Sequence, residues 1–73
     1  MLKNWSKIYI STDPIQVEII GQMLEENNIT TVTINKQDSS YNMFGNIELY
    51  TQNINYENAM KILKNKANEW KKS

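Results

Sequence analysis

The segment from Asn35 to Gly45, which reads NKQDSSYNMFG, holds the side chains best suited to bind a partner or a ligand. Its lysine could meet an anion, its acid and two serines could hold a small ligand, and its aromatic and apolar residues could dock on a protein. Hairpin connections usually have about two to five residues, and longer loops are often functional. We therefore predict a partner- or ligand-binding loop formed by Asn35, Lys36, Gln37, Asp38, Ser39, Ser40 and Tyr41.

A structural role for the same segment is the alternative. Asp38 and the two serines could form turns in which their side-chain oxygens accept hydrogen bonds from nearby backbone amides. Met43 and Phe44 could then cover the neighbouring sheet. For a single residue of such a loop the structural role is the more common one, whereas for the loop as a unit its length favours function.

Catalytic chemistry has little support in the sequence. The chain contains no histidine and no cysteine, so the most common general base and the thiolate nucleophile are both missing. A loop serine near Lys36 could be written as a Ser–Lys pair, but two residues on one loop are weak evidence. Asp38 and Glu48 are too few for a specific metal site. We predict a protein that is not an enzyme, with no catalytic residue, no metal site and no cofactor.

Length and charge limit the classes of partner. A chain of 73 residues forms one domain, predicted over residues 1–73. All eight basic residues are lysines and eight acids balance them, so the chain as a whole has no attraction to nucleic acid or to an anionic membrane. No apolar run reaches the length of a signal peptide or a membrane span, and we expect a cytoplasmic protein that binds no membrane.

The first half of the chain predicts a strand followed by a helix. Residues 5–11 alternate, with Ile8 and Ile10 on one side and bulky or charged residues on the other. Asp13 fits the N-cap of the helix and Gln16 the third helical position, which completes a capping box. Asn28 suits the left-handed position that follows the helix.

The second half predicts two strands and a final helix. Residues 30–35 and 46–51 alternate, and the last helix begins near Asn55. In residues 30–35 we expect Val32 and Ile34 to face the core and the threonines to face outward. In residues 46–51 we expect Ile47 and Leu49 to face the core and Glu48 and Tyr50 to face outward. The order β-α-β-β-α predicts a ferredoxin-like α+β fold, with a three-stranded antiparallel sheet in the order 1-3-2 and both helices on one face. The expected core is Ile8, Ile10, Ile19, Leu24, Val32, Ile34, Ile47, Leu49, Ala59 and Leu63.

Two surfaces of this fold would remain uncovered. The first strand has a free edge, and the face opposite the helices would carry Trp5, Tyr9 and Tyr50. A short chain without a disulfide or metal is marginally stable, so we predict a homo-oligomer, with a dimer favoured, on the aromatic face, the free edge or both. The alternative use of this face is to stack the bases of a single-stranded nucleic acid. Nucleic acid is disfavoured because the face has one lysine and no arginine.

The chain resembles a known family. The stretches IYISTDPIQVEIIGQMLEENNI, INKQDSSY and GNIELY resemble small bacterial domains of unknown function labelled putative prokaryotic signal-transducing protein. Members of that family resemble PII (GlnB-like) regulators, in which the loop between the second and third strands contacts partner proteins and carries a modifiable tyrosine. Tyr41 lies in the corresponding loop, which is much shorter. With only Gly21 and Gly45 in the chain, the glycine-rich nucleotide site of PII proteins has no counterpart.

Residues and resemblance together predict a non-enzymatic regulatory or adaptor module. It would bind a protein partner or a small ligand through the loop of residues 35–45. Binding of single-stranded nucleic acid on the open sheet face is the alternative function.

Overall fold

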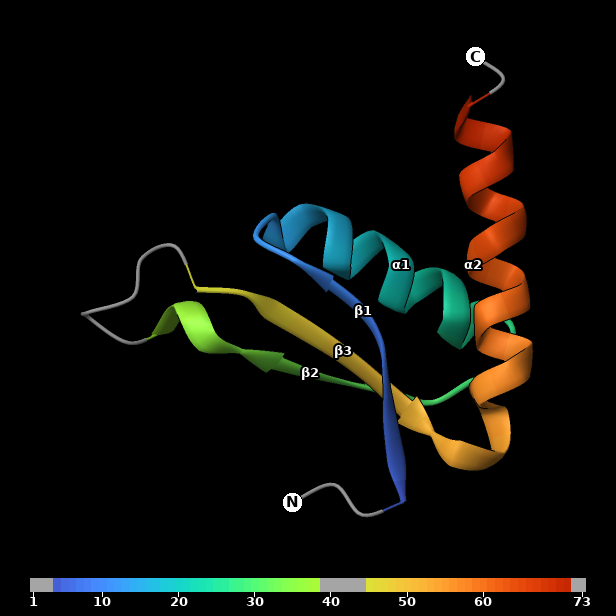
Figure 1. Ribbon diagram of the computed structural model, residues 1–73, viewed down its shortest axis with the longest axis horizontal. Coiled ribbons are helices and arrows are strands. Elements are labelled where there is room, and N and C mark those ends of the chain that lie inside the picture. The colour runs from blue at the N-terminus through green and yellow to red at the C-terminus, as the bar shows by residue number, and fades with distance from the viewer. Residues whose placement is uncertain (1–3, 39–44, 72–73) are drawn as a thin grey trace.

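The structure is a computed structural model that describes residues 4–38 and 45–71 of the chain. The elements, in chain order, are β1 (Trp5–Ser11), α1 (Pro14–Glu26), β2 (Thr31–Asn35), the 3₁₀ turn η1 (Lys36–Asp38), β3 (Ile47–Gln52), the 3₁₀ turn η2 (Asn53–Asn55) and α2 (Tyr56–Lys71). The strands form one antiparallel sheet in the order β1-β3-β2 (Figure 1). The predicted α+β fold, its strand order and its β-α-β-β-α sequence of elements are confirmed.

Both helices cover the same face of the sheet (Figure 1). α1 lies against all three strands, and α2 lies against β1, β3 and α1. Their side chains meet the strands in one apolar core, which consists of Ile8, Val17, Ile20, Leu24, Ile29, Ile47, Leu49 and Ala59. The opposite face of the sheet, which no described helix covers, is called the helix-free face below.

Local interactions set both ends of α1. The Asp13 side chain accepts a hydrogen bond from the Ile15 amide at 3.0 Å, as an N-cap should. The predicted return bond from Gln16 is absent from the hydrogen bonds of the described residues, because the Asp13 amide donates to Ser11 Oγ instead. At the other end Asn28 has φ 64°, and the amides of Asn28 and Ile29 donate to the carbonyls of Glu25 and Leu24. These bonds form a Schellman closure, with Asn28 in the predicted left-handed position.

A β-bulge in β1 changes which side chains face the core. The pairing with β3 shifts by one residue between Lys7 and Tyr9, so Ile8 is the extra residue. Ile8 is buried, and Tyr9 lies opposite Leu49 and packs against the core. Ile10 lies opposite Glu48 and is 46% exposed. The predictions that Ile10 faces the core and Tyr9 the helix-free face are therefore wrong, because strict alternation ends at the bulge.

β2 also presents the opposite face from the one expected. Thr33 lies opposite the buried Leu49, and Thr31 Oγ1 donates to Glu25 Oε2 of α1 at 3.4 Å. The threonines thus face the helices. Val32 and Ile34 lie opposite Tyr50 and Glu48 on the helix-free face and are only partly buried. The alternation of residues 31–35 separates two faces correctly, but it does not say which face the helices cover.

The rest of the predicted core is partly confirmed. Leu24, Ile47, Leu49 and Ala59 are buried, as expected, and Leu63 packs against the core from α2. Ile19 is exposed. The buried stripe of α1 is instead Val17, Ile20 and Leu24, at the three- and four-residue spacing of a single helix face.

Gly21 offers a direct test of the packing of α1. A Cβ placed at Gly21 would lie 3.7 Å from Leu49 Cδ1 and 3.7 Å from Thr31 Oγ1, which is ordinary van der Waals contact. We therefore expect Gly21→Ala to raise the free energy of unfolding by about 0.5–1 kcal/mol, the helix-propensity difference between the two residues. Urea denaturation measures this change, and a loss of stability would show that α1 lies closer to the sheet than the 3.7 Å approaches indicate.

Candidate partner-binding surface

Alternate residues of all three strands form the helix-free face. Residues that pair directly across antiparallel strands point to the same side, so the register defines the set. The described strand residues that share this side with Glu48 are Trp5, Lys7, Ile10, Val32, Ile34, Tyr50 and Gln52. The face therefore combines aliphatic and aromatic side chains with one acid and at least one lysine.

Glu48 lies at the centre of the helix-free face. β3 is the central strand, and Ile10 and Ile34 are its direct neighbours on the two flanking strands. Glu48 is only 6% exposed. A buried carboxylate needs partners, and three side chains supply them. Tyr50 Oη donates to Oε1 at 2.8 Å, and the ammonium groups of Lys7 and Lys36 lie 3.3 Å and 3.2 Å from Oε2.

The partners of Glu48 favour its ionised form. The hydrogen bond from Tyr50 is the largest effect and, with the two lysines, it lowers the pKa of Glu48 below its usual value. Burial acts in the opposite direction but does not prevail. The same hydrogen bond raises the pKa of Tyr50, because the phenolic proton is held by the carboxylate. Glu48 is therefore a carboxylate at neutral pH and Tyr50 a neutral phenol.

The cluster of Lys7, Lys36, Glu48 and Tyr50 carries one net positive charge. The two ammonium groups converge on one carboxylate oxygen, yet the lysine side chains are 44% and 55% exposed. An ammonium group has three N–H donors, so each lysine keeps donors for a second acceptor. Chemically, this arrangement can bind an anionic group that approaches from solvent.

The first residues of the predicted loop are tied to the fold. Asn35 Oδ1 accepts a hydrogen bond from the Gln37 amide at 2.8 Å, and Gln37 Nε2 donates to the Thr12 carbonyl at 2.7 Å. The Lys36 amide donates to the Asn46 carbonyl at 3.1 Å and closes the base of the loop. Asp38 ends the 3₁₀ turn. Three residues of the predicted loop, Ser39, Ser40 and Tyr41, lie outside the described residues.

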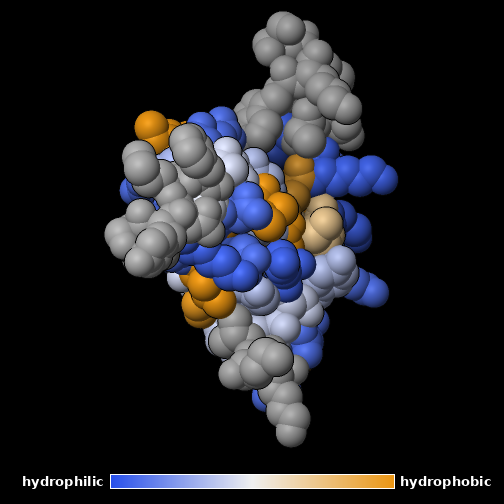
Figure 2. All heavy atoms as spheres, turned by 60° about the vertical axis from the view of Figure 1, so that its left-hand side comes forward, coloured by the Kyte–Doolittle hydropathy of each residue, from blue (hydrophilic) through white to orange (hydrophobic). Residues whose placement is uncertain are grey.

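The predicted aromatic surface is only partly assembled. Trp5 and Tyr50 lie on the helix-free face, whereas Tyr9 lies on the helix side. Trp5 also lines a shallow depression with Asn4, Gln52, Asn53 and Ile54 at the end of the sheet. From the side of the loop, the apolar groups of the described residues appear as separate patches among hydrophilic ones (Figure 2). The register places Lys7, Glu48 and Gln52 on the same face as Trp5 and Tyr50, so the two aromatics are parts of a mixed surface.

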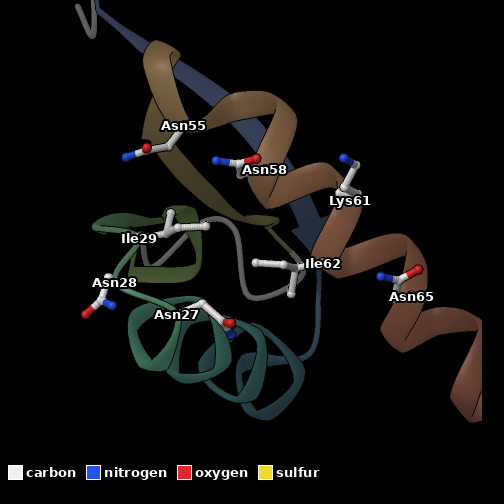
Figure 3. A pocket seen from close by; sticks show the side chains of 8 residues that line it. All are labelled: Asn27, Asn28, Ile29, Asn55, Asn58, Lys61, Ile62 and Asn65. Carbon is white, nitrogen blue, oxygen red and sulfur yellow. The ribbon is translucent and has the colours of Figure 1, made fainter.

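A second concave region lies between the end of α1 and the start of α2 (Figure 3). Its apolar floor is formed by Ile29 and Ile62, whose side chains point toward one another. Amide and ammonium side chains surround them, from Asn27, Asn28, Asn55, Asn58, Lys61 and Asn65. The amides can donate and accept hydrogen bonds. No local pattern in the sequence marks this region, because its residues come from segments far apart in the chain.

The role of Glu48 as the centre of this cluster was not predicted from the sequence. The alternation of β3 placed it correctly on the helix-free face, opposite the side of Ile47 and Leu49. Val32, Ile34 and Lys36 are spaced two residues apart, so they lie on one face of β2 and its extension. This spacing could have indicated Lys36 as a partner of Glu48. Lys36 therefore belongs to the sheet surface as well as to the loop.

Comparison with known proteins gives one result. The family model described as "Putative prokaryotic signal transducing protein" matches residues 5–66. No curated protein and no solved structure matches the chain. Among the described residues, no helix is both long enough and apolar enough to cross a membrane.

Proposed function

The chain belongs to the family of putative prokaryotic signal-transducing proteins, and from that premise we propose that it is a non-enzymatic regulatory module that binds a partner protein. The proposed surface is the helix-free face together with the adjoining segment of residues 35–45. The single observation that carries this proposal is the convergence of Lys7 and Lys36 on the buried Glu48 at the base of that segment.

The cluster has the properties of a fixed recognition element. Lysine side chains are usually flexible, and holding one in place costs rotamer entropy. Glu48 holds both ammonium groups before a partner arrives, so a partner carboxylate would meet two oriented cations beside Ile10 and Tyr50. Electrostatic complementarity of this kind contributes to specificity and to the association rate. A partner that presents an acidic side chain next to apolar ones fits this surface.

Affinity capture from a lysate of the source organism tests the proposal. Wild-type protein is compared with a variant whose residues 35–41 are replaced by a Gly/Ser segment, and with Lys7→Gln/Lys36→Gln. We expect the wild type to retain a specific protein, the loop replacement to lose it, and the double lysine variant to retain at least about tenfold less. Lys64→Gln, on the exposed part of α2, is the matched control and is expected to bind as wild type does.

Two results would contradict the proposal. One is that the wild type captures no protein beyond those that an unrelated control protein also captures. The other is that the loop replacement retains the same partner equally well. Circular dichroism of each variant separates loss of binding from loss of fold.

The structure gives less support to nucleic-acid binding than to protein binding. Of the three aromatics predicted for the base-stacking face, Tyr9 lies on the helix side of the sheet. Titration of a single-stranded RNA oligonucleotide at about 50 and 200 mM salt separates the functions, because binding to phosphates weakens steeply over that range. Steeply salt-dependent RNA binding that Tyr50→Ala abolishes would favour the nucleic-acid function instead.

A further inference from the structure

The two edges of the sheet differ in their capacity to pair with another strand. β1 contains the bulge at Ile8 and an exposed lysine, Lys7, and both features protect an edge from pairing. β2 pairs with β3 in unbroken register and reads TVTIN, without charge, proline or glycine. Among the described residues it is the unprotected edge strand of the sheet.

The register shows which backbone groups of β2 point outward. The Lys36 amide donates to the carbonyl of Asn46, its direct counterpart on the extended β2–β3 register. In an antiparallel pair, hydrogen-bonded and non-hydrogen-bonded pairs alternate. Ile34 and Val32 therefore exchange bonds with β3, whereas the amides and carbonyls of Thr31, Thr33 and Asn35 point away from the sheet.

The outward groups of β2 are self-complementary. If two β2 strands run antiparallel about a two-fold axis at Thr33, then Thr33 faces its own copy and Thr31 faces Asn35 of the other chain. These are the residues whose backbone groups point outward, so three pairs form about six hydrogen bonds. Val32 would lie opposite Ile34 of the other chain, and β-branched pairs of this kind are favourable in sheets. β2 contains no charged residue, so the pairing brings no like charges together.

We propose that the protein forms a two-fold symmetric homodimer through antiparallel pairing of β2 with β2 of a second copy. The dimer joins two three-stranded sheets into one and brings Val32 and Ile34 of both chains together on the helix-free face. This surface differs from the predicted sites of self-association, which were the aromatic face and the edge of β1. The paired residues of β2 do not belong to the Glu48 cluster, so the dimer does not depend on the function proposed above.

A groove on the helix side of β2 would receive side chains of the second copy. The groove runs between β2 and the first half of α1, and its lining residues are Pro14, Val17, Glu18, Thr33, Asn35 and Ile47. An added strand places alternate side chains toward each face, so the threonines of the second β2 would enter it. The paired segments have only five residues each, which indicates a weak dimer with a dissociation constant on the order of tens of micromolar.

Charge exchange at Thr33 tests the proposal. Because Thr33 faces its own copy, Thr33→Lys and Thr33→Glu should each place like charges together and give monomers. An equimolar mixture of the two variants should restore the dimer, because the two charges then have opposite sign. Sedimentation equilibrium between about 10 and 500 µM measures this, since that range spans the expected dissociation constant. Asn65→Lys and Asn65→Glu, on α2 away from β2, are matched controls that should dimerise as wild type does.

Amide hydrogen exchange supplies an independent readout. Exchange at Thr31, Thr33 and Asn35 should slow as wild-type concentration rises, whereas exchange at Val32 and Ile34 should be slow and independent of concentration. A wild type that remains monomeric at 500 µM would overturn the proposal. So would a dimer that persists in both Thr33 variants, or one whose formation leaves exchange at Thr33 unchanged.

Discussion

Replacing Leu49 by alanine is expected to lower the free energy of unfolding by about 3 kcal/mol, within the range of Leu→Ala changes in well-packed cores. Leu49 is fully buried in the central strand, opposite Tyr9 and Thr33 and close to Gly21 of α1. Its removal leaves a cavity bounded by all three strands and a helix, which cannot collapse easily. The free energy of unfolding of a domain of this size is about 5 kcal/mol. The variant would therefore unfold on mild heating.

The control for this change is Ile54→Ala, which removes a similar aliphatic group from a side chain that is 86% exposed. We expect a change within about 0.5 kcal/mol, as for most surface substitutions. Urea denaturation of both variants gives the comparison. Equal losses for Leu49 and Ile54 would mean that the core does not lie between the sheet and α1.

Glu48→Gln is expected to remove a pH-dependent part of the stability. The folded-state pKa of Glu48 is below its usual value of 4.5, so its ionised form stabilises the folded state. That contribution is fully present above the unfolded-state pKa and is lost as pH falls through the folded-state pKa. Wild-type stability should therefore decrease below about pH 4.5, with a smaller decrease in Glu48→Gln. At pH 7 the variant should be less stable, because two lysines remain together without their carboxylate.

Two measurements check the Glu48 prediction. Urea denaturation between pH 3 and pH 7 gives the pH dependence, with Glu18→Gln on the exposed side of α1 as the matched carboxylate-to-amide control. Spectrophotometric titration of Tyr50 reports on the cluster directly. Its pKa is raised by the hydrogen bond to Glu48, so Glu48→Gln should move it down toward the usual value. An unchanged Tyr50 titration would show that the hydrogen bond does not form in solution.

Patterns along the chain predicted the elements because each has a local cause. Asp13 and Asn28 mark the two ends of α1 through hydrogen bonds within a few residues, and both were predicted from residue type alone. The alternation of β3 likewise placed Ile47 and Leu49 in the core and Glu48 outside it. The strand order followed from the rule that β-α-β crossovers are right-handed, with the third strand inserted between the first two as in ferredoxin-like folds.

The predictions from the sequence were wrong where the decisive interaction joins residues that lie far apart in the chain. A bulge is set by the pairing of β1 with β3, and nothing in the residues around Ile8 marks one position as extra. The face of β2 depends on its register with β3 and on the contact of Thr31 with Glu25, so the pattern of residues 31–35 fits both faces. The Glu48 cluster joins β1, β3 and the start of the loop, which only the folded chain brings together.

The bulge in β1 also determines how far a sheet made from this chain can grow. A protein with two flat, unprotected edges can add copies at both ends without limit, which is the geometry of fibrils. In the proposed dimer, pairing through β2 would use the flat edge of each copy and leave β1, with its bulge at Ile8, at both outer ends. Extension would then stop at two chains. One additional residue in a strand would thus separate a finite assembly from a filament.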